Sequence, residues 1–80
     1  MDHHHEDDIA EQMGTMSERE KLGKLLEYWI RHNEEHAKTY LEWSKKAATE
    51  DLKDVASLLE EASDTTIYIN RLLKDALKKL

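Results

Sequence analysis

The stretch LGKLLEYWIRHNEEHAKTYLEWSKKAA, at residues 22–48, decides the fold of this chain. Apolar and weakly polar residues recur in it at alternating steps of four and three residues, the heptad pattern of helices that pack with a left-handed twist. The positions are Leu22, Leu26, Trp29, Asn33, His36, Tyr40, Trp43 and Ala47. The stretch therefore predicts one long helix that packs along a narrow seam.

Local signals place the ends of this helix and the start of a second one. Ser17-Glu18-Arg19-Glu20 matches a capping box, so the first helix should begin there. The heptad pattern stops at Thr49-Glu50, and Asp51 is a suitable N-cap for a second helix. Heptad steps then resume at Leu52, Val55, Leu59, Ala62, Thr66, Ile69, Leu73, Ala76 and Leu80. We expect helices at about 17–48 and 52–79, after an acidic, mobile tail at 1–16.

The short connection makes the two helices an antiparallel hairpin. One seam buries too little to stabilise a small domain alone, and both apolar stripes are wider than one seam. The additional apolar residues are Leu25, Ile30, Ala37, Leu41, Ala48, Leu58, Leu72 and Leu77. We therefore predict an all-α fold in which the hairpin pairs with a second copy in a four-helix bundle, as a homodimer or a tetramer.

Composition excludes several classes of function. The chain has 80 residues, no Cys and a net charge of −6, so it has neither disulfides nor a thiolate nucleophile. Residues 1–18 contain six acidic residues and no Lys or Arg, so the rest is balanced. A balanced body without a basic run argues against nucleic-acid and membrane-surface partners. No apolar run approaches the ~18 residues of a membrane span, and no signal peptide is visible. We expect no membrane insertion and a cytoplasmic location.

No enzymatic activity and no organic cofactor are predicted. Residues 32–36 match H-x-x-E-H, the pattern of inverted zinc peptidases. In that scheme His32 and His36 bind zinc and Glu35 activates water. The short remainder of the chain offers neither the distant third ligand nor the substrate cleft of such an enzyme. Gly14 and Gly23 stand apart, so no glycine-rich phosphate motif occurs.

Polar residues interrupt the predicted seam near mid-helix. We expect Asn33, His36 and Thr66 in neighbouring layers, with Asn70 or Asp64 close by. One interpretation is a polar layer that sets the register of the helices, with His36 bonded to Thr66 or to a tyrosine. The other is a metal or ligand site built into the bundle.

His32 and His36 are one helical turn apart, and imidazoles at this spacing can share one transition-metal ion. Tyr28 and Tyr40 extend the same ladder. Two ligands are too few for a tight site. We expect Glu35, Asp64, or the same two histidines of a second copy to complete it.

The N-terminal tail contains three consecutive histidines beside four carboxylates. The Met1 amine, two backbone amides and the His3 imidazole can form a square-planar site that suits Ni(II) or Cu(II). His4, His5 and Asp7 add further ligands. The same tail is also typical of an affinity-tag remnant or of a solubilising acidic arm.

The motif W-I-x-H-N-x-E-H-A spans residues 29–37, and Tyr40 and Trp43 follow it. Together with residues 25–48 and 55–63, it resembles a small uncharacterised helical domain of anaerobic archaea and bacteria. Relatives often carry a His-rich run just before this domain, and some are associated with nickel or cobalt uptake. The resemblance implies transition-metal handling by an oligomeric or metal-sensing helical body.

We therefore expect a small protein that binds a transition metal for storage, delivery or sensing. Ni(II) is the first choice, with Co(II), Cu(II) or Zn(II) as alternatives. The candidate ligands are His3, His4, His5, His32, Glu35 and His36. The alternative hypothesis is a dimerisation or adaptor module without metal, in which Asn33 and His36 set the register.

Overall fold

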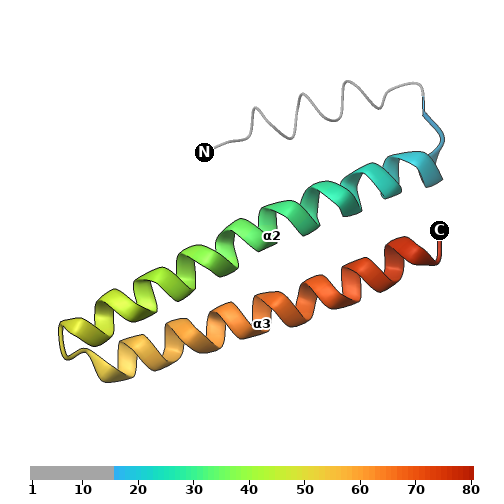
Figure 1. The fold of residues 1–80 in the computed structure, drawn as a ribbon. Coiled ribbons are helices and arrows are strands. Elements are labelled where there is room, and N and C mark those ends of the chain that lie inside the picture. The colour runs from blue at the N-terminus through green and yellow to red at the C-terminus, as the bar shows by residue number, and fades with distance from the viewer. Residues whose placement is uncertain (1–15) are drawn as a thin grey trace.

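The computed structural model describes residues 16–80, which form two long helices joined by a tight turn (Figure 1). Helix α2 spans Glu18–Thr49 and helix α3 spans Lys53–Lys78. The two helices run antiparallel and side by side, so the predicted all-α hairpin is confirmed. Each helix end differs by one residue from the position expected from the sequence. The prediction of a mobile tail falls almost entirely outside the described residues.

The start of α2 is fixed by the capping box that the sequence predicts. The Ser17 hydroxyl accepts a hydrogen bond from the Glu20 N–H at 3.1 Å, and the Ser17 N–H donates to the Glu20 carboxylate at 3.1 Å. Glu18 and Glu20 also place negative charge at the positive end of the helix dipole.

The turn between the helices corrects one prediction, because Asp51 is not the N-cap of α3. Leu52 holds that position, without a side-chain cap bond. Asp51 instead adopts a left-handed conformation, with φ at 64°. Its N–H donates to the Ala48 carbonyl and the Leu52 N–H donates to the Ala47 carbonyl. This pair of bonds is the Schellman motif that ends many helices, so Asp51 serves the end of α2.

The seam of the hairpin also differs from the prediction, in half of its positions. Leu26 and Ala47 are buried as expected, but Trp29 and Trp43 are 39% and 55% exposed and His36 is exposed. The seam contains the residue that follows each of these three: Ile30, Ala37 and Ser44. On α3, Ser63 and Asn70 are buried, whereas Val55 and Ile69 of the predicted seam are exposed.

Small polar side chains bind the two helices together across this seam. The hydroxyls of Ser44 and Ser63 donate to the carbonyls of Ala56 at 2.7 Å and Ala37 at 2.8 Å. These bonds require backbones that approach closely, which the small seam residues permit. Each carbonyl accepts from only one level of the opposite helix, so the bonds set the register of the hairpin.

An asparagine pair provides the next cross-link along the seam. The Asn70 amide donates to the Ile30 carbonyl at 2.8 Å, and its oxygen accepts from the Asn33 amide at 3.0 Å. Among the described residues, no buried side-chain nitrogen or oxygen lacks a hydrogen-bond partner. The seam is therefore a fully satisfied polar network, which favours one specific arrangement.

Neither α2 nor α3 has the continuous apolar length that a membrane-crossing helix requires.

Candidate functional site

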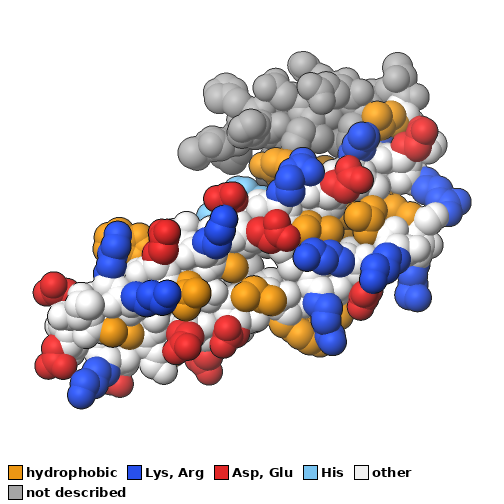
Figure 2. All heavy atoms as spheres, viewed as in Figure 1, with side chains coloured by type: hydrophobic (Ala, Val, Ile, Leu, Met, Phe, Trp, Pro, Cys, Tyr) orange, Lys and Arg blue, Asp and Glu red, His pale blue; other side chains and the backbone are white. Residues whose placement is uncertain are grey.

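The hairpin has two broad faces of different chemistry. Figure 2 shows one of them, where Lys and Arg side chains intermingle with Asp and Glu along both helices and histidine appears only at the upper edge. We call it the charged face. It includes the groove lined by Glu34, Lys38, Ile67, Arg71 and Lys74.

The opposite side, which we call the apolar face, holds two heptad stripes. They are Leu22, Trp29, His36 and Trp43 on α2, and Val55, Ala62, Ile69 and Ala76 on α3. Leu25 and His32 flank the first stripe, and Leu58 and Leu72 flank the second. Each stripe lies one residue before the inner seam residues of its helix. Equal offsets on antiparallel helices place both stripes on the same side of the hairpin.

His32 and His36 lie on the apolar face, close to one another and exposed. Their Nε2 atoms are 3.0 Å apart, and their rings meet edge to face with centroids 4.4 Å apart. Tyr28 stacks on His32 at 5.6 Å and Tyr40 on His36 at 5.8 Å. Four rings therefore form one ladder along α2, as their spacing predicts, and the two tyrosines hold the imidazoles in place.

The expectation that His36 sits in the hairpin seam and bonds Thr66 or a tyrosine is wrong. The Thr66 hydroxyl donates to the Ala62 carbonyl of its own helix, and the partner of His36 is His32. The seam takes the residue after His36, Ala37, because α2 is rotated slightly from the predicted orientation. In contrast, Asn33 and Asn70 do meet, so of the two residues expected close to the polar layer, Asn70 or Asp64, the structure places Asn70 there.

The separation of the two Nε2 atoms suits shared coordination of one metal ion. Two metal–nitrogen bonds of about 2.0–2.1 Å that enclose a tetrahedral angle leave their nitrogens about 3.3 Å apart. The observed 3.0 Å is close to this value. In the structure the two nitrogens face one another as a hydrogen-bonded pair, so metal binding would replace the shared proton and turn both lone pairs to one ion.

A single hairpin supplies only these two ligands. Within residues 16–80, no group of three or more His, Asp or Glu side chains is placed to hold a metal ion. Glu35 instead lines the groove on the charged face, and Asp64 does not join the histidines. His3, His4 and His5 lie outside the described residues. The structure thus brings together two of the six predicted ligands.

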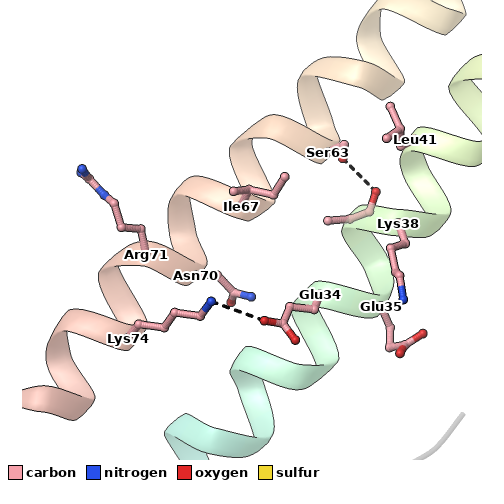
Figure 3. A pocket seen from close by; sticks show the side chains of 10 residues that line it. Glu34, Glu35, Lys38, Leu41, Ser63, Ile67, Asn70, Arg71 and Lys74 are labelled. Atoms are coloured by element: carbon pink, nitrogen blue, oxygen red, sulfur yellow. Dashed lines mark hydrogen bonds and ion pairs between the residues drawn. The ribbon is translucent and has the colours of Figure 1, made fainter.

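The groove on the charged face is a feature that the sequence does not reveal (Figure 3). It has a volume of about 600 Å³, and Ala37, Ser63 and Asn70 contribute to its lining. It forms because these seam residues are small, whereas the side chains along its rim are long. Lys74 and Glu34 form an ion pair across it at 3.4 Å. Both side chains are about half exposed, so this pair adds little stability.

The seam serines are the structural residues that the sequence reasoning missed, and Ala37 was expected in the second interface instead of the seam. Ser44 and Ser63 are polar, so a count of apolar periodicity passes over them. A different signal marks them: small residues recur every seven positions at 37 and 44, and again at 56 and 63. That spacing indicates close approach of two helices.

Comparison with known proteins adds a family but no activity. A family model described as a domain of unknown function, DUF8180, matches residues 22–80. No curated protein and no solved structure matches the chain.

Proposed function

Since the chain belongs to the DUF8180 family, whose function is unknown, we propose from geometry that it is a self-associating module. Two hairpins pack their apolar faces together and form a four-helix bundle. The observation that carries this proposal is that about half of the heptad positions are not buried between the two helices of the hairpin. Trp29, Trp43 and Ile69 follow the pattern, yet each remains substantially exposed.

The apolar face favours association because it is large and continuous. Large exposed apolar residues follow the face over most of its length: Leu22, Trp29, Trp43, Val55, Leu58, Ile69 and Leu72. Monomeric proteins rarely expose contiguous apolar patches of this kind. In each heptad, one position lies in the inner seam of the hairpin and the position before it lies on the apolar face. A four-helix bundle buries both positions, whereas the hairpin alone buries only the first. A partner of equal length would bury the other.

The pattern on α3 supports a second copy as that partner. Consider two α3 helices that cross antiparallel at the level of residue 67. Leu58 then meets Ala76 of the other copy, Leu72 meets Ala62, and Ile69 meets Thr65. In each pair a large residue faces a smaller one, which is the complementarity that close helix packing needs. The face is therefore complementary to itself.

Two isoleucines on α3 provide a matched test. Ile69 is on the apolar face and 43% exposed, whereas Ile67 lines the groove on the charged face and is 58% exposed. We expect Ile69→Lys to weaken the dimer by at least about tenfold, because a buried lysine loses its hydration. Ile67→Lys should leave the dimer unchanged. Sedimentation velocity across a dilution series measures both, and circular dichroism verifies that each variant folds.

Equal dimer strength in the two variants, or a wild-type chain that stays monomeric at micromolar concentration, would contradict self-association through this face. A monomer would also be the result if another segment, such as residues 1–15, covers the face in the same chain.

A second candidate function is transition-metal binding, for storage, delivery or sensing. The 3.0 Å approach of the His32 and His36 Nε2 atoms supports it. So does the chemistry of His3, His4 and His5, whose imidazoles and neighbouring carboxylates attract divalent ions. Ni(II) is the proposed ion for the tail, since consecutive imidazole side chains are ligands that suit Ni(II).

Calorimetric titration with Ni(II) separates the two groups of histidines. We expect His3→Ala to remove the tightest tail site, and His32→Ala/His36→Ala to remove a separate binding event. If neither variant changes the Ni(II) isotherm, the metal-binding proposal is wrong, and self-association remains as the function.

A further inference from the structure

We propose that the two His32–His36 pairs of a dimer meet at its two-fold axis and together form one four-imidazole site for a tetrahedral divalent ion of the Zn(II) or Co(II) type. The inference rests on the proposed self-association. It commits to one ion for two chains, held between the hairpins, instead of one ion on each hairpin.

The position of the histidines on α2 is the first argument. His32 and His36 lie on either side of the midpoint of α2, which spans Glu18–Thr49. When two equal helices pack antiparallel with full overlap, their two-fold axis passes through that midpoint. His32 of one copy then lies beside His36 of the other, and the reverse contact follows by symmetry.

The register of the hairpin is the second argument. Two cross-helix bonds fix it near its centre: Ser63 to the Ala37 carbonyl, and Asn70 to the Ile30 carbonyl. Halfway between these bonds, residues 33–34 of α2 are level with residues 66–67 of α3. Residue 67 is also the point about which the large residues of α3 face the smaller residues of α3 in the second copy.

One axis therefore satisfies both helices. About residue 34, the α2 stripe pairs Trp29 with Thr39 of the second copy, Trp43 with Leu25, and His32 with His36. About residue 67, the α3 stripe forms the pairs described above. The histidine pairing needs no adjustment of the packing, because the apolar residues select the same axis.

The geometry of each pair suits half of a tetrahedral site. Each hairpin presents two Nε2 atoms 3.0 Å apart, and four neutral imidazoles complete the coordination of Zn(II) or Co(II). Tyr28 and Tyr40 stack on the outer sides of the rings and limit their rotation. Trp29 and Trp43 lie about two turns away on either side of His36 along the stripe, so the site would be flanked by apolar surface.

Titration with Co(II) tests the site, since tetrahedral Co(II) has strong visible absorption and octahedral Co(II) does not. The full chain is used with His3, His4 and His5 replaced by alanine, so that the tail contributes no imidazole. We expect tetrahedral bands that saturate at one ion for two chains. Co(II) should also lower the dissociation constant of the dimer by at least about tenfold. His36→Ala should abolish the bands.

The Ile69→Lys and Ile67→Lys variants are the decisive controls, because both retain all the site histidines. Ile69→Lys should lose the tetrahedral bands together with the dimer, and Ile67→Lys should keep both. Saturation at one ion for each chain, or bands that survive in monomeric Ile69→Lys, would overturn the shared site.

Failure of the site is distinguishable from failure of the proposed function. A metal-free dimer that Ile69→Lys disrupts, but that binds no tetrahedral Co(II), overturns the site and leaves self-association standing. That result would also follow from a dimer whose two-fold axis runs along the helices and keeps the histidine pairs apart. A chain that remains monomeric with and without Co(II) overturns both.

Discussion

The hydroxyl of Ser63 crosses the hairpin and donates to the backbone carbonyl of Ala37 at 2.8 Å. Both residues are buried, at 3% and 6% exposed, so at this level the two helices have no space for a larger side chain. The contact explains why the aromatic residues of α2 face outward. A seam this narrow accepts alanine and serine, and it leaves the large side chains for another partner.

Enlarging Ser63 should therefore open the hairpin. Ser63→Leu forces the helices apart and should destabilise the fold by about 1–3 kcal/mol. Ser63→Ala should cost about 1 kcal/mol or less, because the Ala37 carbonyl keeps its own helical hydrogen bond. Urea unfolding at one fixed chain concentration measures both variants. A leucine variant as stable as the alanine variant would show that the helices are not in close contact here.

The asparagine pair should behave as one energetic unit. Asn70→Leu leaves the half-buried Asn33 amide without its partner and should cost about 1–3 kcal/mol. Asn33→Leu/Asn70→Leu should cost less than the two single changes added together, because it removes both polar groups. The double-mutant cycle, followed by urea unfolding, gives the coupling. Strictly additive effects would mean that the 3.0 Å contact between the two amides contributes nothing.

The backbone of Asp51 in the turn has a strained conformation that a substitution can relieve. Asp51 has a φ of 64°, which glycine adopts at no steric cost and other residues do not. Asp51→Gly should stabilise the hairpin by about 0.5–1 kcal/mol. Asp54→Gly is the matched control: it lies inside the first turn of α3 and should destabilise by about 1 kcal/mol. Thermal unfolding that ranks the two variants in the reverse order would contradict the assignment of the turn.

Gly23 provides a test at the open end of the hairpin. It lies inside α2, where glycine costs about 1 kcal/mol relative to alanine. An added Cβ would contact the Leu80 side chain at 3.5 Å, an ordinary van der Waals distance. Gly23→Ala should therefore raise stability by about 1 kcal/mol in the same unfolding assay. A loss of stability would place Leu80 closer to α2 than the structure does.

Heptad spacing predicted two helices and a polar layer at Asn33 with Asn70 or Asp64 close by, and the short connection predicted antiparallel pairing. The spacing could not tell which side of each stripe forms the hairpin seam, because a four-helix bundle has two kinds of helix contact and one period describes both. The seam forms at Ala37, Ser44 and Ser63 because these small residues let the helices approach more closely than Trp29 or His36 would. Backbone strain at Asp51 likewise leaves no mark in the sequence.

The candidate site was predictable to a similar extent. The spacing of four residues correctly places His32 and His36 together, and Tyr28 and Tyr40 around them. Glu35 directly precedes His36 and therefore points in another direction around the helix. It lines the groove on the charged face, which the spacing of the histidines does not show. The remaining ligands depend on a second chain, which heptad spacing suggests but cannot orient.

The mass of the wild-type chain in solution tests the central claim most directly. Sedimentation equilibrium at micromolar concentration, in the presence of a metal chelator, should give about twice the chain mass of 9.4 kDa. Self-association through the apolar face predicts this value without any metal ion. A single species of 9.4 kDa would contradict it.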